Sequence, residues 1–575
     1  MMNQSPVHER IAQRLRRLYG DAAPKCLHRF QYLLGRYGVE EKEPGGNRRW
    51  GPNDVVLITY ADTIQSPDSA SLQTLKQFAT RHLKGSICTI HLLPFYPWSS
   101  DDGFSVVDYR AVDERYGSWR DVEALGGEFK LMFDLVLNHC SARNRWFRDY
   151  VTGIAPASGY FLPTDPSSDL SAVVRPRPWP LLTKTATRDG VAHVWTTFSG
   201  DQVDLNWRNP DVLFEFLDIL FLYLSKGCHI LRLDAVAFLW KELGTDCMHR
   251  PETHEVVKLF RDVLELVAPE ALIVTETNVP HVENISYFGQ GDEAHMVYNF
   301  SLPPLLLHAL LREDSQLLTN WARGLPELGP GQTFFNFTAS HDGIGVRPLQ
   351  GLVSDTEIQW LAAEMRARGG KVSMKRNSDG SESPYELNIT YRSALEFPGD
   401  GPLSVARFLC SQAILLAFKG MPAIYFHSLV GTPNDTEGLK ESGENRSINR
   451  RKYDWDELNQ LLKDPENDQH RIFGVYLNWL RRRRDRAVFH PDAPMKVIEL
   501  GSEFFAFERV ALNGEERLMA LFNVTSKNRE LKLERLGDSW AKVAQCRDLL
   551  SGKQIRIAER QRLRFKPFQA LWLYR

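Results

Sequence analysis

The sequence has 575 residues, which at roughly 100–200 residues per domain predicts three or four domains. Its 70 Lys and Arg against 72 Asp and Glu leave a formal net charge of −2 at pH 7, which excludes the broad positive potential of proteins that bind nucleic acid or anionic membranes. Hydrophobic residues make up 43% of the chain, yet no uninterrupted apolar run approaches the ~18 residues of a membrane-spanning helix, so we expect a soluble globular protein.

Residues 1–50 are predicted to form a helical N-terminal extension, because Ile11, Leu15 and Leu18 are spaced to share one helix face. Eight short apolar runs follow and alternate with helix-length amphipathic segments, which is the pattern of a parallel β/α array. The runs are VVLITY (55–60), ICTIHLLPF (87–95), LMFDLVLNH (131–139), HILRLDAVAF (229–238), ALIVTETN (271–278), HMVYNF (295–300), TFFNFTASHD (333–342) and MPAIYF (421–426). They predict an α/β fold, a (β/α)8 TIM barrel.

Two intervals, 140–208 and 345–404, are too long and too polar for ordinary barrel loops, and we expect them to be inserted subdomains. The barrel would then comprise residues 51–139, 209–344 and 405–490. From residue 491 to 575 the chain turns to short alternating segments between charged turns, which predicts a C-terminal antiparallel β domain.

Seven cysteines are scattered singly, without the spacing of a metal site, and are expected to be reduced thiols. The first residues, MMNQSPVHERIAQRLRRLYG, carry charges where a signal peptide needs an apolar stretch. Both features predict a cytoplasmic location.

Polar side chains follow the ends of several predicted strands, and in a TIM barrel the carboxyl ends of the strands surround the active site. These residues are Asn138 and His139, Arg232 and Asp234, Glu276 and Asn278, and His341 and Asp342. Three carboxylates on one rim, without a metal-binding motif, indicate glycosidic bond cleavage. In that chemistry one ionised carboxylate attacks the anomeric carbon and a protonated one protonates the leaving oxygen.

Arg232 lies two positions before Asp234 on the same strand face and would hold Asp234 ionised. The alternative for Arg232 is a purely structural salt bridge inside the barrel. A histidine such as His139 or His341, taken alone, is more often a hydrogen-bonded rim residue than a ligand contact.

Four ordered motifs resemble those of the α-amylase-like enzymes, glycoside hydrolase family thirteen. The motifs are DLVLNH (134–139), LRLDAVAF (231–238), VTETN (274–278) and SHDG (340–343). The resemblance implies that Asp234 is the nucleophile, Glu276 the general acid/base, and Asp342 the carboxylate that binds two sugar hydroxyls and distorts the ring. The implied glucose subsite also contains His139, Arg232 and His341.

Further segments look like the sucrose phosphorylase subfamily, whose members exchange an α-glucosyl unit between an acceptor and inorganic phosphate with retention. The segments are ITYAD (58–62), HLLPFYPWSSDDGFSVVDY (91–109), RPRP (175–178), SLPPLLLHAL (301–310) and ENRSINRRKY (444–453). By this resemblance Asp102 and Phe104 close the glucose pocket, and Arg446 reaches the sugar. Arg177 together with Tyr385 would meet the phosphate. Neither a metal nor an organic cofactor is expected, because phosphate is a substrate and the carboxylates perform the chemistry.

The arginines of the RPRP segment suit phosphate, because a guanidinium offers a bidentate fork and the neighbouring prolines stiffen the loop. The alternative for Arg175 and Arg177 is a solvated, Pro-rich surface loop.

The acceptor is the open question. Glu386 stands where sucrose phosphorylases typically have a Gln that contacts fructose, and Asn278 stands where a His is common. The loop KRNSDGSESPYELNITY, the N-terminal extension and ENRSINRRKY look more like the glucosylglycerate phosphorylases of the subfamily, which split 2-O-α-D-glucosyl-D-glycerate with phosphate. A carboxylate-bearing acceptor favours a nearby cation, for which the candidates are Lys375, Arg376 and Arg450. Sucrose, sucrose 6-phosphate and glucosylglycerol phosphorylases, a glucosidase or transglucosidase, and a non-catalytic binding protein are the alternatives.

Overall fold

The computed structural model describes residues 6–39, 49–176, 179–376, 381–397, 399–541, 543–557 and 561–575. Eight parallel strands close into a barrel in which each strand pairs with its successor and the last pairs back to the first. They are β1 (Val56–Thr59), β3 (Thr89–Leu92), β4 (Lys130–Val136), β9 (Cys228–Asp234), β10 (Leu272–Thr275), β11 (Met296–Tyr298), β12 (Thr333–Asn336) and β16 (Met421–Tyr425). Each coincides with one of the eight apolar runs, with β4 and β9 beginning one residue earlier, so the predicted TIM barrel is confirmed.

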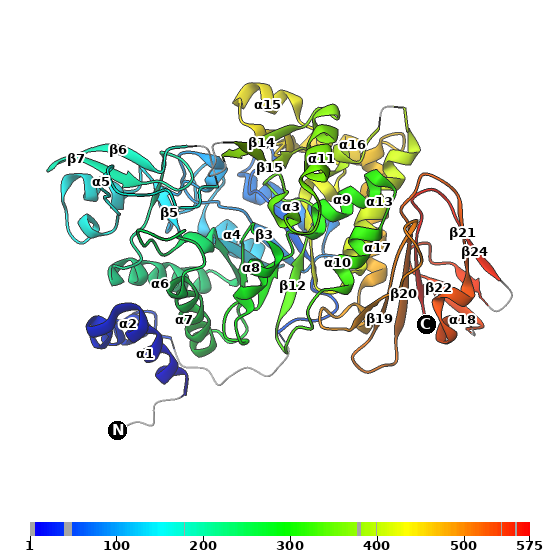
Figure 1. Cartoon of the computed structure of the whole chain (residues 1–575), viewed down its shortest axis with the longest axis horizontal. Coiled ribbons are helices and arrows are strands. Elements are labelled where there is room, and N and C mark those ends of the chain that lie inside the picture. The colour runs from blue at the N-terminus through cyan, green and yellow to red at the C-terminus, as the bar shows by residue number, and fades with distance from the viewer. Residues whose placement is uncertain are drawn as a thin grey trace.

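The strands are nearly continuous apolar runs because both of their faces are buried, one in the barrel interior and one under helices. The helices that follow the strands form the outer layer (Figure 1). The longer ones are α3 (Ser71–His82), α4 (Trp119–Gly126), α6 (Pro210–Ser225), α7 (Pro251–Val267), α9 (Leu302–Arg312), α10 (Gln316–Arg323), α13 (Pro402–Ala417), α16 (Trp455–Lys463) and α17 (Asp468–Arg483).

Two groups of elements rise above the barrel on the same side of the molecule (Figure 1). The first follows β4 and contains β5 (His139–Ser141), α5 (Arg145–Thr152), β6 (Leu182–Thr187), β7 (Gly190–Trp195) and β8 (Gln202–Asp204). The second follows β12 and contains β13 (Ile344–Gly345), α11 (Asp355–Ala367), β14 (Lys371–Arg376), β15 (Glu382–Asn388) and α12 (Tyr391–Ala394). In the second group the strands form a sheet in the order β13-β15-β14, which places Glu386 opposite Gly345. We propose 140–208 and 345–404 as the limits of the two insertions.

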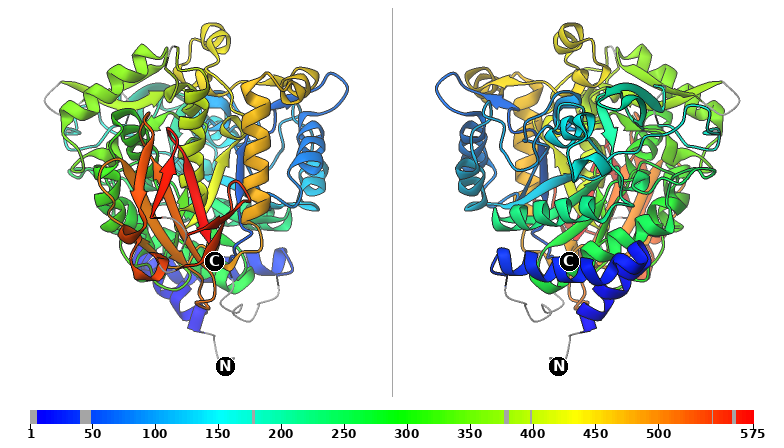
Figure 2. Two further views of the ribbon diagram at one scale, coloured as in Figure 1. Left: turned by 90° about the vertical axis from the view of Figure 1, so that its right-hand side faces the viewer. Right: turned by 90° about the vertical axis from the view of Figure 1, so that its left-hand side faces the viewer.

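The N-terminal helices α1 (Pro6–Tyr19) and α2 (Ala23–Arg36) lie at the opposite end of the molecule from α15 (Thr436–Ser442), as the dark blue and yellow ribbons of Figure 2 show. Ile11, Leu15 and Leu18 are buried, as their spacing predicts. Arg10 Nε lies 2.7 Å from Asp262 Oδ1 of α7, so ion pairs also fasten α1 to the barrel.

The C-terminal part forms a six-stranded antiparallel sheet in the order β18-β19-β20-β25-β22-β23, which confirms the predicted β architecture. These strands are β18 (Met495–Val497), β19 (Phe504–Val510), β20 (Arg517–Asn523), β22 (Gln545–Asp548), β23 (Gln554–Arg556) and β25 (Ala570–Tyr574). A separate pair joins β21 (Arg529–Lys532) and β24 (Arg562–Phe565).

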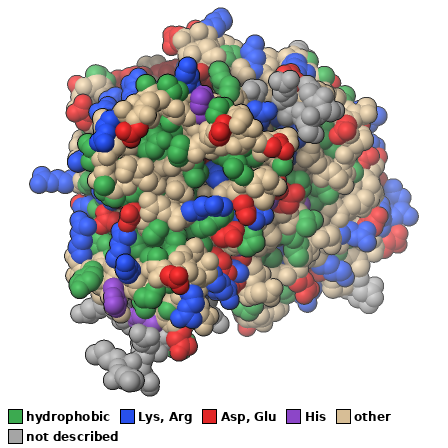
Figure 3. Space-filling model, turned by 60° about the vertical axis from the view of Figure 1, so that its left-hand side comes forward, with side chains coloured by type: hydrophobic (Ala, Val, Ile, Leu, Met, Phe, Trp, Pro, Cys, Tyr) green, Lys and Arg blue, Asp and Glu red, His purple; other side chains and the backbone are tan. Residues whose placement is uncertain are grey.

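Cationic and anionic side chains are interspersed over the face of the molecule in Figure 3, in keeping with the net charge of −2. All seven cysteines are free thiols. Across the ranges that the structure describes, no helix combines the length and the apolar character needed to cross a membrane.

Candidate active site

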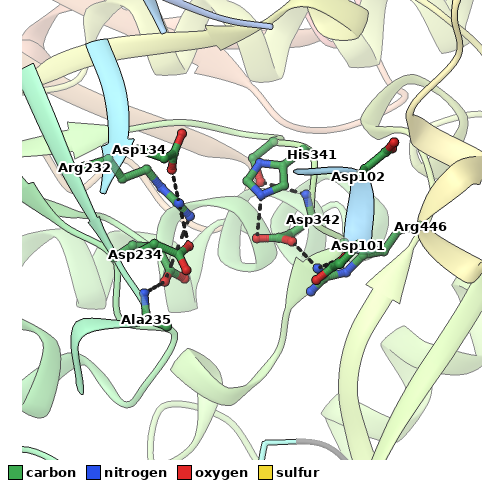
Figure 4. Close-up of polar contacts among 12 residues, drawn as sticks. Asp101, Asp102, Asp134, Arg232, Asp234, Ala235, His341, Asp342 and Arg446 are labelled. Atoms are coloured by element: carbon green, nitrogen blue, oxygen red, sulfur yellow. Dashed lines mark hydrogen bonds and ion pairs between the residues drawn. The ribbon is translucent and has the colours of Figure 1, made fainter. Parts of the chain in front are cut away.

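The floor of the site is an arginine held between carboxylates at the ends of β4 and β9. Parallel pairing places Asp134 beside Arg232 and Val136 beside Asp234. Arg232 is 1% exposed; its Nη1 donates to Asp234 Oδ1 at 2.7 Å and also to Asp134 (Figure 4). Burial alone would lower the pKa of this guanidinium, but Asp134 and the other anionic neighbours outweigh burial and raise it well above the ordinary value. Arg232 is therefore a fixed positive charge beneath the site.

A left-handed turn follows Asp234 at once. Ala235 has φ of 49°, a conformation that costs a residue with a Cβ about 1–2 kcal/mol. The turn aims the backbone N–H of Ala235 at Glu276, whose Oε2 accepts it at 3.0 Å. The backbone of β9 thus orients the carboxyl group that follows β10, which explains why strain is tolerated here.

Asp234 and Glu276 are buried together, and Arg232 decides which of them carries the negative charge. Burial raises the pKa of both carboxyls, and an ionised Glu276 would raise that of Asp234 further. Arg232 Nη1 lies 2.7 Å from Asp234, whereas its Nη2 lies 4.0 Å from Glu276. The closer ion pair favours ionised Asp234 and makes Glu276 the better site for the shared proton. Because Oε2 of Glu276 accepts from Ala235, Oε1 is the oxygen open to that proton.

The opposite wall is built by His341, Asp342 and Phe104. The rings of Phe104 and His341 stack with centroids 4.6 Å apart and planes within 6°. Burial, reinforced by the charges of Arg232 and Arg450, lowers the pKa of His341 well below its ordinary value. Burial also lowers the pKa of His139, whose Nε2 lies 3.1 Å from the carbonyl oxygen of Phe104. Both imidazoles are therefore neutral hydrogen-bonding groups.

Arg446 connects this wall, through Asp342 (Figure 4), to Glu386 of the second insertion. Its Nη1 lies 2.7 Å from Asp342 Oδ1, while Nε and Nη2 donate to the two oxygens of Glu386 at 3.0 and 2.8 Å. Such a bidentate pair fixes orientation as well as charge. Gly343 makes the approach possible, because a Cβ at this position would lie 2.6 Å from Glu386 Cγ and 2.7 Å from the carbonyl oxygen of Leu387. This contact accounts for the glycine of the SHDG motif.

These groups surround one cavity, with about 760 Å³ of empty space including its opening to solvent. Most residues singled out in the sequence line it. They are Phe104, His139, Asp234, Glu276, Asn278, His341, Asp342, Tyr385, Glu386 and Arg446. Arg232 lies beneath, in contact with Asp234.

Other sequence expectations do not match the geometry. Asp101, not Asp102, lines the cavity, because Asp102 turns its carboxylate toward Arg450 Nη1 at 3.3 Å. Arg450 itself is buried, and its Nε donates to the carbonyl oxygen of His341 at 2.8 Å, so it is a structural cation.

The remaining cations named from the sequence lie away from the cavity lining or outside the described residues. Lys375 is half-buried and does not line the cavity. Arg175 is exposed. Arg177 lies outside the described residues, as does the side chain of Arg376. Arg347 was not singled out in the sequence, yet it lines the cavity.

Comparisons with known proteins agree with this architecture. Residues 83–320 match the family model of the α-amylase catalytic domain. The chain is 45% identical to glucosylglycerate phosphorylase of Spirochaeta thermophila, over 91% of this chain and 90% of that protein. It is 44% identical to glucosylglycerate phosphorylase of Escherichia coli, over 92% of each chain.

Among solved structures, the fold resembles sucrose 6F-phosphate phosphorylase from Thermoanaerobacter thermosaccharolyticum with a TM-score of 0.72 and 22% identity, covering 83% of this chain and 95% of that one. The extensive identity to the two phosphorylases establishes the relationship, and the structural likeness supports the shared fold. The chain belongs to the α-amylase family, in the subfamily of sucrose and glucosylglycerate phosphorylases.

Proposed function

We propose that this protein is a retaining glucoside phosphorylase that transfers an α-glucosyl unit reversibly from 2-O-α-D-glucosyl-D-glycerate to inorganic phosphate. The products are α-D-glucose 1-phosphate and D-glycerate. The observation that carries the proposal is the 45% identity to a glucosylglycerate phosphorylase over 91% of this chain. The buried carboxylates Asp234 and Glu276 in one cavity supply the chemistry that this reaction needs.

In the first displacement, a carboxylate oxygen of Asp234 forms a bond to the anomeric carbon of glucose. The bond from that carbon to the glycerate oxygen breaks, and Glu276 gives its proton to the departing oxygen. Arg232 favours ionised Asp234 through the 2.7 Å contact, and burial raises the pKa of Glu276, which favours its protonated form. The step leaves a β-glucosyl ester on Asp234 and a carboxylate on Glu276.

In the second displacement, a phosphate oxygen attacks the anomeric carbon and the ester bond to Asp234 breaks. Glu276 regains a proton from the incoming phosphate when phosphate enters as the monoanion. Two inversions at one carbon give net retention, so the product is the α-anomer. We assign phosphate binding to Tyr385, which lines the cavity, together with Arg177.

Asp342 and Arg446 are assigned to the glucosyl unit. The 2.7 Å ion pair holds the Asp342 carboxylate in one orientation, in which its oxygens accept hydrogen bonds from sugar hydroxyls. His139 and His341, both neutral, add hydrogen bonds without repelling Arg232. A group that binds the distorted ring more tightly than the relaxed one lowers the barrier.

The proposal is tested by supplying α-D-glucose 1-phosphate with D-glycerate, fructose, fructose 6-phosphate or glycerol in turn and measuring phosphate release. We expect D-glycerate to give the highest kcat/KM. Release only with a fructose compound would assign the protein to sucrose or sucrose 6-phosphate phosphorolysis. Glucose formation from the glucoside in phosphate-free buffer would instead indicate a glucosidase.

A further inference from the structure

Two arginines line the active-site cavity, and among the described residues only Arg446 has carboxylate partners. Arg446 is paired with Asp342 and Glu386. Arg347 begins the short turn Arg347–Leu349, two residues after β13. Its Nε is buried and has no hydrogen-bond partner within the described part of the chain. A half-buried guanidinium without a hydrogen-bond partner raises the free energy of the folded protein unless a ligand supplies an anion.

The other arginines around the cavity each have a carboxylate partner, whereas none is found for Arg347 among the described residues. Arg232 contacts Asp134 and Asp234, and Arg450 contacts Asp102. In contrast, Arg347 has a cationic neighbour, Lys375. The pKa of Lys375 is lowered mainly by burial and also by the positive charge of Arg347. Lys375 also has an anionic neighbour, since Asp355 acts to raise its pKa. The charge that no described carboxylate pairs, and that an anion entering the cavity can meet, is therefore that of Arg347.

Arg347 lies on the acceptor side of the cavity. A Cβ at Gly345 would lie 2.6 Å from the amide atoms of Asn278, so the strand that leads to Arg347 packs directly on Asn278. Asn278 in turn follows the general acid Glu276 by two residues. Because Glu276 delivers its proton to the oxygen of the departing acceptor, the acceptor must lie against this wall.

Asn278 also has an unsatisfied atom. Its Oδ1 is buried without a hydrogen-bond partner among the residues that the structure describes. The wall thus presents a hydrogen-bond donor, Arg347 Nε, and an acceptor, Asn278 Oδ1, that no described residue satisfies. D-glycerate offers the complement, because its reacting oxygen is flanked by a carboxylate on one side and a hydroxymethyl group on the other.

We propose that Arg347 binds the carboxylate of D-glycerate, and that Asn278 Oδ1 accepts a hydrogen bond from its free hydroxyl. The inference rests on the proposed function and names the residues that set its acceptor specificity. A guanidinium fork fits a planar carboxylate in bidentate fashion, and the unpaired Nε supplies one of the two donors. A neutral acceptor leaves Arg347 unpaired, which disfavours fructose and glycerol.

Phosphate is the other anion that enters this cavity, so the experiment separates the two. The exchange of radiolabelled phosphate into α-D-glucose 1-phosphate uses the glucosyl and phosphate subsites without any acceptor. Synthesis from α-D-glucose 1-phosphate and D-glycerate uses all three. Arg347→Gln and Arg347→Lys are compared with Arg366→Gln, which changes an exposed arginine of α11 outside the cavity lining.

For Arg347→Gln we expect the KM for D-glycerate to rise on the order of 10²-fold, with phosphate exchange within about threefold of wild type. Arg347→Lys should recover part of the loss, and Arg366→Gln should match wild type. Equal loss of exchange and synthesis would assign Arg347 to phosphate and overturn the inference, as would an unchanged KM for D-glycerate. Wild-type protein that exchanges phosphate but ignores D-glycerate would refute the proposed function itself.

The role of Asn278 is tested with D-lactate, which lacks the free hydroxyl of D-glycerate. Wild type should prefer D-glycerate, and Asn278→Ala should remove most of that preference while leaving phosphate exchange active. An undiminished preference in the variant would show that another group binds the hydroxyl.

Discussion

Replacing Glu276 by Gln separates the two halves of the proposed reaction. The amide keeps a carbonyl oxygen for the Ala235 N–H, now 3.0 Å from Oε2, and Arg232 keeps both Asp134 and Asp234. The floor of the site should therefore be preserved while the transferable proton is lost. An alkoxide is a poor leaving group without that proton, whereas phosphate leaves readily as an anion.

The expected magnitude follows from the leaving group. Loss of a general acid costs about 10²–10⁴-fold, so Glu276→Gln should lower the kcat for phosphorolysis of glucosylglycerate by that factor. Exchange of labelled phosphate into α-D-glucose 1-phosphate needs no such proton and should fall by about tenfold or less. Both rates are measured on the same preparation. An equal fall in the two would refute the assignment of Glu276 as the acid.

The pH dependence of phosphorolysis and of phosphate exchange also tests the assignment of Glu276 as the acid. Burial raises the pKa of Glu276, so wild-type phosphorolysis of the glucoside should decline as pH rises through that pKa, when the proton is lost. The exchange reaction should lack this decline. Ionised Glu276 also raises the pKa of Asp234. At the lower pH where Asp234 takes up its proton, Glu276 is already protonated, so Glu276→Gln should leave the acid limb of the exchange profile unchanged. An alkaline decline that persists in the residual phosphorolysis of the variant would contradict the proton assignment.

Other substitutions test separate parts of the structure. Asp234→Asn should lower the rate of every glucosyl transfer on the order of 10⁴-fold or more, while the Tm stays within a few degrees of that of the wild type. Phosphate exchange near the wild-type rate would refute the role of Asp234 as nucleophile. In Gly343→Ala the new Cβ would lie 2.6 Å from Glu386 Cγ and should force Glu386 away from Arg446. We therefore expect a higher KM for α-D-glucose 1-phosphate. Wild-type kinetics would show that this contact is unimportant. Arg14→Met removes a guanidinium that lies 3.3 Å from Glu255 and 3.4 Å from Asp262, and should lower the free energy of unfolding by roughly 3 kcal/mol. The kcat should not change, because α1 lies at the far end of the molecule from the cavity. Lost activity in folded protein would contradict this.

The barrel could be predicted because a parallel strand buried on both faces appears in the sequence as a short, continuous apolar run. The polar residues that interrupt or end these runs, such as Asp234 and Glu276, could be predicted for the same reason, since no core position would accept them alone. The motif SHDG contains a glycine whose purpose becomes visible only where Glu386 approaches it.

The pair of Arg232 with Asp234 could be predicted because the two residues are neighbours on one strand, but the other ion pairs of the site could not, because their partners are distant in the chain. Arg446 and Glu386 are separated by 60 positions, and the sequence does not show that each neutralises the other. Arg450 was a candidate for acceptor binding by charge alone, but burial against Asp102 and His341 makes it structural. In the sequence, Arg347 is one arginine in a predicted loop, and nothing around it indicates a binding role. Its place in the cavity depends on the packing of β13 against Asn278.

The most direct test of the central claim is to incubate the wild-type protein with 2-O-α-D-glucosyl-D-glycerate, with and without phosphate, and identify the sugar product by NMR. The proposed function predicts α-D-glucose 1-phosphate and one equivalent of D-glycerate when phosphate is present, and little turnover without it. Free glucose at the same rate in both samples, or the β-anomer of the phosphate, would contradict a retaining phosphorylase.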